Sequence, residues 1–540
     1  MNYSLRRCAL IALLNLLLVG IICNEACAFV PIYGGATFSS AAGGYQDEAG
    51  LQGYYPFPID QANSVGTSGP LVSAVNDAGV AVSMTDSSYA NASNTSKGAR
   101  AVRFSATTAP LEMDSLDRST ISHDFDGAAP LAMNASGVVV GQAYTYTNSP
   151  GFPLDHGLVD SRPVRWNAAG TVATELDTIG TDASGHATGA AYAVNAAGTA
   201  VGSSYAYSAD HNYSGFVATR WDAAGTAVTL LSLPGQFYTS AAYAINDSGV
   251  AVGYSSVRSP GAGGDRAIRW DANAIQPTVL GALGYTIGGV GTSYAWDINA
   301  AGKAVGMSYK IDNAGNSVGT RGVRWDVNAI DPTELGTLGT DSGGTSDINF
   351  ALKINTAGTT VGIAEKYDNS GTPLGVRPVR WAAGGTAATE LGLLGTSTTG
   401  QASGVANDIN DNGVTVGRLS SYVNGNGGNL KAVYWTANGA AVDLNRLIDP
   451  SLGWDLIEAR HISNTGWITG WGNYDPDGAG GQSYYPRAFL IHLPTDGDYN
   501  LDGAVDAADY VLWRATLGST TNLAADGNQN GVIDSSDFDV

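Results

Sequence analysis

A short phrase recurs along this chain of 540 residues and constrains its fold more than any other feature. Each copy places apolar residues on both sides of a four-residue segment that begins with Asn and ends with Gly, as in residues 244–253. These preferences are typical of a type I turn, so each copy predicts a β-hairpin. The recurring asparagines are Asn76, Asn134, Asn195, Asn246, Asn299, Asn355, Asn410 and Asn464, at intervals of 51 to 61 residues. Such a period predicts an array of similar units.

A second phrase, Arg-x-Val-Arg-Trp, follows several hairpins, as in residues 321–325 and 377–381. Its alternation puts Val and Trp on one face, as a half-buried strand requires. Leu-Gly segments at 335–339 and 391–395 then predict a fourth strand. We therefore expect an all-β chain, in which residues 29–494 form a repeat-built β-propeller of about eight four-stranded blades. Seven blades, or an open β-solenoid, are the alternatives.

The eighth unit has no sequence for a fourth strand. Its hairpin covers residues 462–470 and its third strand 487–492, and Pro494 follows almost at once. Residues 29–70 precede the first hairpin and contain an apolar stretch, residues 29–33. We expect this segment to supply the missing strand and close the ring, because an open ring would leave unpaired edges.

The N-terminus predicts export. Arg6 and Arg7 precede an apolar run at residues 8–22, and Ala26-Cys27-Ala28 matches a signal-peptidase site. Residues 1–28 are therefore predicted to be a signal peptide, with an uncleaved anchor as the alternative. The mature protein is expected to be secreted or at the cell surface, with no membrane segment. The three cysteines all lie before residue 29, so the mature protein would have no disulfide.

The net charge of −22 argues against nucleic acid as a partner, because phosphate binding needs a basic surface.

Two calcium-loop patterns stand near the C-terminus. In residues 498–509 oxygen ligands fall at loop positions 1, 3, 5, 9 and 12, and Gly503 stands at position 6, where the loop turns sharply. These ligands are Asp498, Asn500, Asp502, Asp506 and Asp509. Residues 526–537 repeat the pattern with Asp526, Asn528, Asn530, Asp534 and Asp537. We expect two Ca²⁺ sites, and the alternative is a series of Asp/Asn-rich turns. Residues 507–517 predict a helix that ends at Gly518.

The order loop, helix, linker, loop in residues 495–540 resembles a type I dockerin, a module of two F-hand motifs. The resemblance implies a cohesin-like or other surface protein as partner. The chain departs from it in two ways. The sequence stops at Val540, where the second F-hand helix should begin, so we expect either a truncated module or an incomplete sequence. Ala507-Ala508 and Ser535-Ser536 also replace the usual Ser-Thr pair.

The hairpin phrase, the Leu-Gly-Thr-Leu-Gly segment and residues 453–470 resemble the HAF-type extracellular repeat family over residues 70–494. This resemblance implies an exported repeat protein without known catalytic residues.

No catalytic constellation is recognisable, so any catalytic residues are unknown. The six histidines (His123, His156, His186, His211, His461 and His492) lack metal-ligand spacing and are interpreted as surface or structural residues. The strand arginines either form a basic ring for acidic glycans or pair with turn carboxylates and cover the tryptophans, and the second interpretation is favoured. A glycan site is otherwise expected in the long loops at 422–429 and 473–482.

The sequence predicts an exported, non-catalytic binding or structural protein, attached through its calcium-dependent tail to a surface or a multiprotein assembly. The alternative is a carbohydrate-active enzyme, a polysaccharide hydrolase or lyase acting in polysaccharide catabolism, with a carboxylate pair.

Overall fold

The structure is a computed structural model of the whole chain. It describes residues 71–84, 100–116, 127–148, 156–207, 211–231, 237–259, 262–448, 453–475, 485–493, 507–519 and 532–537, apart from single positions inside these ranges, together with Val30–Pro31 and Ala525. The predicted signal peptide and most of the predicted calcium ligands lie outside the described residues.

The described residues form eight four-stranded antiparallel sheets, numbered here in chain order. The first holds β2 (Leu71–Val75), β3 (Val80–Met84), β4 (Ala101–Ser105) and β5 (Leu111–Met113); the second β6 (Gly127–Met133), β7 (Val139–Asn148), β8 (His156–Trp166) and β9 (Ala173–Glu175). The third holds β10 (Gly189–Val194), β11 (Ala200–Tyr207), β12 (Tyr213–Trp221) and β13 (Val228–Leu230); the fourth β14 (Phe237–Ile245), β15 (Ala251–Ser259), β16 (Ala262–Trp270) and β17 (Thr278–Val279). The third and fourth are joined by one parallel pair, Phe216 with Thr239.

The fifth sheet holds β18 (Ser293–Ile298), β19 (Ala304–Ile311), β20 (Ser317–Trp325) and β21 (Thr333–Glu334); the sixth β22 (Asn349–Ile354), β23 (Thr360–Tyr367), β24 (Pro373–Trp381) and β25 (Ala388–Glu390). The seventh holds β26 (Gly404–Ile409), β27 (Thr415–Val423), β28 (Asn426–Trp435) and β29 (Ala441–Asp443), followed by a 3₁₀ turn, η1 (Leu444–Leu447). The eighth holds β30 (Trp454–Ile462), β31 (Trp467–Tyr474), β32 (Tyr485–His492) and, from the N-terminal region, β1 (Val30–Pro31).

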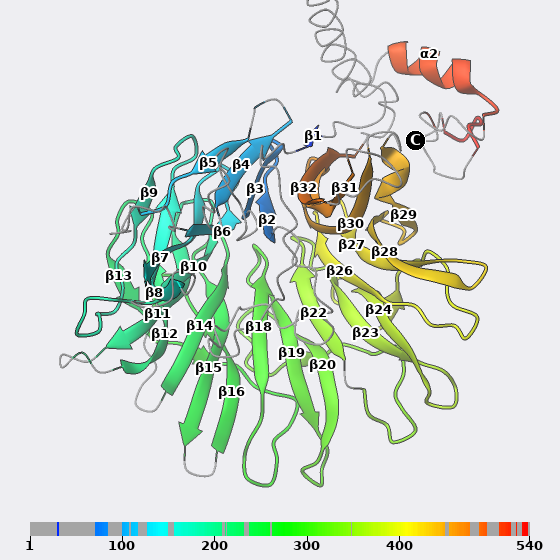
Figure 1. The fold of residues 1–540 in the computed structure, drawn as a ribbon. Helices are drawn as coiled ribbons and strands as arrows, with labels where there is room; N and C mark the ends of the chain where they lie inside the picture. Colours follow the sequence, from blue (N-terminus) through cyan, green and yellow to red (C-terminus); the bar gives the residue numbers. More distant parts are fainter. Residues whose placement is uncertain are drawn as a thin grey trace, which may run out of the picture.

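The sheets follow one another around a closed, propeller-like ring (Figure 1). An apolar cluster joins each sheet to the next, such as the one that packs Val361 and Leu391 of the sixth sheet against Trp435 of the seventh. The first and eighth sheets share such a cluster too, in which Val72 and Phe104 pack with Leu490. The first strands of neighbouring sheets contact one another all the way round, so they form the innermost layer of the ring. The predicted alternative of an open solenoid is therefore wrong.

The predicted closing strand is confirmed. Strand β1 pairs antiparallel with β32, with Val30 opposite Leu490 and Pro31 opposite Phe489. The backbone NH of Asn464 also donates to Asp77 Oδ1 across the same junction, at 2.7 Å. The ring is thus closed by an N-terminal strand, which forms the outer edge of the last sheet and pairs with two residues of β32.

Two details of the predicted repeat are corrected. The fourth strands β21 and β25 end before the Leu-Gly segments, which instead cross to the next sheet, where Leu338 and Leu394 form isolated parallel bridges to Lys366 and Ser421. A fourth strand of two or three residues can form because it lies at the outer edge of its sheet and pairs with the third strand alone. In the eighth hairpin, Ser463 rather than Asn464 starts the turn, since the Gly466 NH donates to the Ser463 carbonyl oxygen.

Every first strand carries a β-bulge just before its end. A glycine of the second strand lies opposite it in sheets two to eight, and Ser83 takes this place in the first sheet. In the fourth sheet the register shifts between Ala242 and Ala244, opposite Gly253 and Val252. A Cβ built on Gly253 would lie 1.9 Å from the carbonyl oxygen of Ala241. The repeated glycine of the second strand therefore leaves room for the bulge, which the first sheet forms with Ser83 at the same place.

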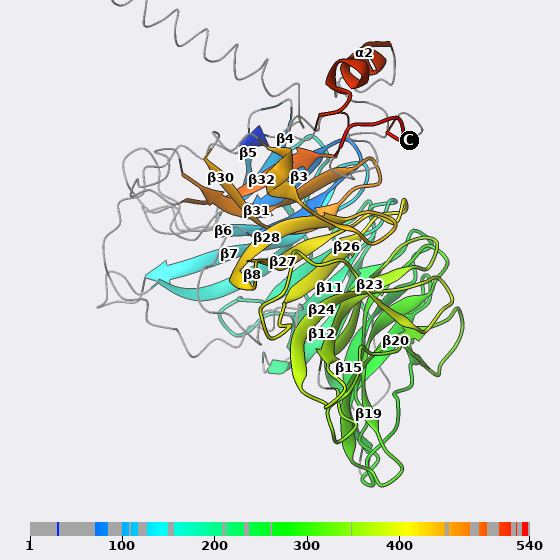
Figure 2. The ribbon, with the colours of Figure 1, turned by 90° about the vertical axis from the view of Figure 1, so that its right-hand side faces the viewer.

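Helix α2 (Ala507–Thr516) lies outside the ring of sheets in both views (Figures 1 and 2). It confirms the predicted helix, and Gly518 after it has a left-handed φ of 85°, as a helix-ending glycine requires. No helix among the described residues is long and apolar enough to cross a membrane.

Candidate functional site

The repeated asparagines hold the ring together. Seven of the eight begin a turn directly after a first strand and are buried, and in the eighth sheet Ser463 takes this place. In the fourth sheet Asn246 Oδ1 accepts from the Val250 NH at 3.0 Å, and its Nδ2 donates to the carbonyl oxygen of Asn299 in the next sheet at 3.1 Å. Equivalent links run from Asn134, Asn195, Asn299, Asn355 and Asn410 to the turn that follows each of them around the ring. These amides are structural.

The arginines of the third strands are also used within the protein. Arg165 is 7% exposed and donates to the carbonyl oxygens of Asp222 and Ala223 in the next sheet, each at 3.0 Å. Arg103, Arg220, Arg324 and Arg380 make the same kind of link. A basic ring for acidic glycans is therefore excluded for these side chains. The favoured alternative holds for Arg269 and Arg324, which pair with the turn carboxylates of Asp271 and Asp326 at 3.1 and 3.0 Å. The other arginines of this position bond to turn carbonyl oxygens instead.

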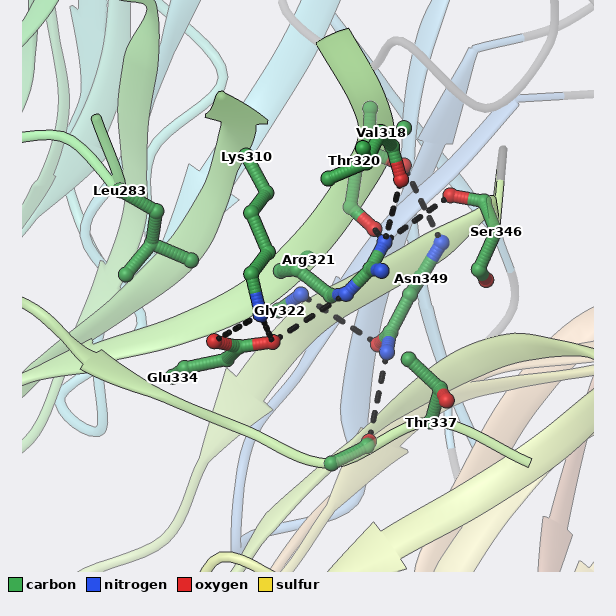
Figure 3. A network of polar contacts seen from close by, with 12 residues as sticks. Leu283, Lys310, Val318, Thr320, Arg321, Gly322, Glu334, Thr337, Ser346 and Asn349 are labelled. Atoms are coloured by element: carbon green, nitrogen blue, oxygen red, sulfur yellow. Dashed lines mark hydrogen bonds and ion pairs between the residues drawn. The ribbon is translucent and has the colours of Figure 1, made fainter. Parts of the chain in front are cut away.

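The other arginine of the phrase bridges within and between sheets, as Figure 3 shows for Arg321. Its Nε lies 3.2 Å from Glu334 Oε1, and its Nη1 donates to the Ser346 carbonyl oxygen at 3.2 Å. Lys310 approaches the same Glu334 carboxylate at 2.9 Å, and Asn349 of the sixth sheet accepts from the Gly322 NH. Arg321 is 4% exposed and joins two sheets, while Lys310 and Glu334 keep 39% and 35% of their side chains exposed.

The tryptophans that end the third strands are core residues. Trp166, Trp221, Trp270, Trp325, Trp381 and Trp435 are all fully buried. Trp381 Nε1, for example, donates to the Gly336 carbonyl oxygen of the preceding sheet at 3.0 Å. The asparagines, arginines and tryptophans that repeat from sheet to sheet thus have structural roles within the ring.

One position of the repeat differs between the two halves of the ring: the penultimate residue of each first strand. It is alanine in sheets one to four (Ala74, Ala132, Ala193 and Ala244) and charged or titratable in sheets five to eight (Asp297, Lys353, Asp408 and His461). First strands are covered on both faces by neighbouring sheets and on one edge by a second strand. Their remaining exposure therefore faces the ring axis, and we call these four residues the charged arc of the inner wall.

The first half of the charged arc pairs Asp297 with Lys353. Their closest atoms, Oδ1 and Nζ, are 3.7 Å apart, and the side chains are 16% and 32% exposed. Asp297 Oδ2 also accepts from the Ile354 NH at 3.0 Å, so the carboxylate is held across two sheets. Burial raises the pKa of Asp297, and Lys353 only partly offsets this; the Asp297 carboxylate in turn raises the pKa of Lys353. Asp408 acts on both groups as a further negative charge.

The second half repeats this construction. Asp408 Oδ2 lies 3.5 Å from His461 Nδ1 and accepts from the Ile462 NH at 3.2 Å, again across two sheets. Asp408 and His461 are 18% and 26% exposed. His461, interpreted from the sequence as a surface or structural histidine, stands beside this carboxylate on the innermost strand. Comparing the penultimate residues of the repeats would have found it.

A second cluster stands next to the charged arc. Glu458 is 5% exposed and accepts from Asn407 Nδ2 at 3.0 Å and from Trp471 Nε1 at 3.0 Å. Its carboxylate also pairs with Arg460 at 3.1 Å and Arg418 at 3.6 Å. Burial raises the pKa of Glu458, but the two arginines and the two hydrogen bonds outweigh it and lower the pKa to about 2.

Aromatic side chains line the inner strands of sheets three to six. Tyr192, Tyr243 and Tyr254 form a run with ring centroids 6.2 and 5.5 Å apart. Burial raises the pKa of Tyr243 well above 10. Trp296, the bulged residue directly before Asp297, is half-buried and meets Phe350 edge to face at 5.6 Å. Aromatic and charged groups therefore adjoin at the fifth and sixth sheets.

Three of the ten predicted calcium ligands are described: Asp509, Asp534 and Asp537. Asp509 and Asp537, the last ligands of the two loops, are 2% and 0% exposed. The other seven (Asp498, Asn500, Asp502, Asp506, Asp526, Asn528 and Asn530) lie outside the described residues. Among described residues no group of three or more His, Cys, Asp or Glu side chains is arranged to hold a metal.

The predicted glycan loops differ from expectation where they are described. Residues 422–429 belong mainly to β27 and β28, which extend into a tight turn at Asn424 and Gly425. Their length therefore reflects a long hairpin rather than an irregular loop. Within 473–482, residues 476–482 lie outside the described residues.

The model of the family described as "Protein of unknown function (DUF3466)" matches residues 166–317 and 307–511, more than half of the chain. No curated protein matches the chain.

Several solved structures match the chain at 8–12% identity, with TM-scores of 0.36 to 0.38. The Dos1 propeller matches 79% of this chain and 92% of its own with a TM-score of 0.37, at 10% identity. The β-propeller domain of the Trilobed protease from Pyrococcus furiosus matches 71% and 97% with a TM-score of 0.36, at 8% identity. A puromycin hydrolase matches 76% of this chain with a TM-score of 0.38, at 12% identity, and the match spans 60% of the hydrolase.

Proposed function

Since the chain belongs to the family described as "Protein of unknown function (DUF3466)", which assigns no activity, we propose a function from its own residues. It is an exported, non-catalytic binding protein whose ring presents a ligand site and whose calcium-dependent tail attaches it to a surface or an assembly. Within this proposal the ring is of the HAF-type extracellular kind, and residues 495–540 form a dockerin-like module.

The observation that carries the proposal is the burial of Asp509 and Asp537, at 2% and 0% exposure. They occupy the twelfth position of each loop pattern, where a calcium loop places its closing carboxylate. Burying a carboxylate is costly unless hydrogen-bond donors or a cation accompany it. Asp537 Oδ2 accepts from the Asp534 NH at 2.7 Å, and we propose that a calcium ion adds to such contacts at both loops. This donor set, hard oxygens at loop spacing with both closing carboxylates turned inward, fits Ca²⁺.

The packing between the two loop regions supports a paired module. The Gly518 NH donates to the Ile533 carbonyl oxygen at 2.7 Å, and the Ile533 NH donates to that of Ser519 at 2.9 Å. Trp513 packs with Ala525 and Ile533, and its Nε1 donates to the Asp534 carbonyl oxygen at 3.0 Å. Bound calcium would tie each loop to this small core, so attachment would be lost when calcium is removed.

Calorimetric titration of Ca²⁺ into residues 29–540 tests the tail. Two bound ions are expected, and Asp498→Ala with Asp526→Ala should abolish binding. Asp312→Ala with Asp368→Ala, two turn aspartates of the ring, is the matched control and should bind both ions. A calcium-dependent pull-down from cell-surface proteins, cohesin-like proteins included, then tests attachment. Unchanged binding in the tail variant would refute the calcium sites.

One observation favours a second candidate, a polysaccharide hydrolase or lyase. Asp297 and Asp408 flank Lys353 on the inner wall, and burial raises the pKa of Asp297, as a general acid requires. A panel of polysaccharides, assayed for new reducing ends and for unsaturated products, tests it. Turnover that is lost in both Asp297→Asn and Asp408→Asn would favour this candidate over the binding protein.

A further inference from the structure

The charged arc alternates acceptor and donor around the axis. Asp297 and Asp408 present carboxylate oxygens, while Lys353 and His461 present nitrogens, one from each of four consecutive sheets. We propose that this arc, with Trp296 beside it, binds the ring of an uncharged saccharide. The inference deepens the proposed function by naming the ligand, and it rests on that function for the role of the ring in binding.

The alternation selects hydroxyl groups. A hydroxyl donates one hydrogen bond and accepts others, so a single one can bridge a carboxylate and a neighbouring ammonium or imidazole. The two ion pairs are loose, at 3.7 Å for Asp297–Lys353 and 3.5 Å for Asp408–His461. A further polar group could therefore hydrogen-bond to both members of each pair. Adjacent hydroxyls of a sugar ring match a row of this kind.

The acceptors are held in place before a ligand arrives. Asp297 accepts from the Ile354 NH, and Asp408 accepts from the NH groups of Ile409 at 2.9 Å and Ile462 at 3.2 Å. These bonds orient the carboxylates across the junctions between sheets. Because their orientation is already fixed, binding a hydroxyl costs little conformational entropy.

The charges of the wall cancel, which favours an uncharged ligand. Asp297, Asp408 and Glu458 are opposed by Lys353, Arg418 and Arg460, which leaves no excess cation for a uronate or sulfate. The chain as a whole carries −22, so a polyanion would also be repelled at long range.

Trp296 supplies the apolar surface that a sugar needs. The bulge makes Trp296 the extra residue between Ala295 and Asp297, so that an indole directly precedes the carboxylate on this strand. Part of the indole packs against the apolar cluster of Leu352, Ile363 and Val405. Phe350 supports the indole edge to face at 84°. Stacking of sugar C–H groups on a half-buried indole beside hydroxyl-binding groups gives both affinity and orientation.

The test measures saccharide binding to residues 29–540, using neutral β-glucan, xylan, mannan and galactan oligosaccharides, with oligogalacturonate as the charged arm. Lys353→Met and Trp296→Ala are each expected to weaken binding of the neutral ligand at least tenfold. Lys366→Met is the matched control for the lysine, since Lys366 lies on the same sheet, is 36% exposed and pairs with Glu390. Tyr309→Ala, 40% exposed on the fifth sheet, is the aromatic control.

Neutral binding that falls in the two wall variants and persists in the controls supports the inference. Binding of oligogalacturonate alone, of no saccharide, or equal binding in all four variants would overturn it. Calcium titration of the same preparation reports separately on the tail, so failure of the attachment module and failure of the saccharide site are distinguished.

Discussion

Replacing Glu458 with glutamine should remove a large acid-sensitive part of the stability of the ring. Glu458 lies on the innermost strand of the last sheet and is 5% exposed. Its burial alone would raise its pKa, and Arg460, Arg418, Trp471 and Asn407 reverse this, so that the pKa falls from 4.5 to about 2. Folding therefore stabilises the ionised form of the Glu458 carboxyl relative to its protonated form.

The sign and size follow from this difference. A carboxyl whose pKa is lowered by folding contributes stability that is fully present above its unfolded value near 4.5 and is lost as the pH falls toward about 2. The contribution amounts to roughly 3 kcal/mol of the free energy of unfolding. Glutamine keeps the shape but leaves Arg460 and Arg418 without their anion, so the variant should lose about this amount at neutral pH.

Urea unfolding, followed by tryptophan fluorescence between pH 2.5 and pH 7, measures the effect. The gap between the wild type and Glu458→Gln should be largest above pH 5 and close as the pH falls. Glu112→Gln is the control, because Glu112 is 51% exposed and pairs with Arg100 only at 3.5 Å. A gap that stays constant with pH, or no gap, would refute the assignment of Glu458 as a buried anion.

Three further predictions concern the ring. Asn246→Ala removes the hydrogen bond to Asn299 and the acceptor of the Val250 NH. It should lower the free energy of unfolding, measured in urea, by about 1–3 kcal/mol. Asn426→Ala, on an exposed hairpin end, is the control and should lower it by less than about 0.5 kcal/mol. Gly253→Ala would place a Cβ 1.9 Å from the Ala241 oxygen and should destabilise by about 3 kcal/mol or more, whereas Gly170→Ala, with 3.7 Å to its nearest neighbour, should be tolerated. Deleting residues 29–33 removes the β1 partner of β32 and should lower the thermal midpoint by several degrees; an unchanged midpoint would show that closure does not depend on β1.

Much of the ring could be predicted from the sequence because its turns carry a strong local signal. The Asn-x-x-Gly segments and the helix before Gly518 follow from local preferences that the tertiary structure agrees with. The closing strand at residues 30–31 follows instead from the fourth strand that the eighth unit lacks. The fourth strands were harder, because β21 is two residues long and such a strand has no periodicity of its own. The Leu-Gly segments were wrongly predicted to be fourth strands because Leu335 and Leu391 are apolar and buried, as strand residues are, although these segments cross between sheets.

The charged arc could not be predicted from sequence motifs, for a different reason. Lys353, Asp408 and His461 follow Asp297 at intervals of 56, 55 and 53 residues, a spacing that no short motif contains. They come together only because the ring stacks equivalent strands side by side. The signal was present in the sequence as the penultimate strand residue of each repeat, but reading it required knowing which residue ends each strand.

The contrast between repeated and unrepeated positions bears on what the ring can bind. Asparagine, arginine and tryptophan recur because each junction between sheets needs the same bonds, and those side chains are buried by making them. The penultimate position makes no such obligatory bond in sheets one to four, where alanine suffices. Charged groups at that position in sheets five to eight are therefore not required by the architecture. Since they occupy only one half of the wall, a ligand that uses them must contact the ring asymmetrically, and substitutions at Ala132 or Ala193 should affect its binding far less than substitutions at Lys353 or His461.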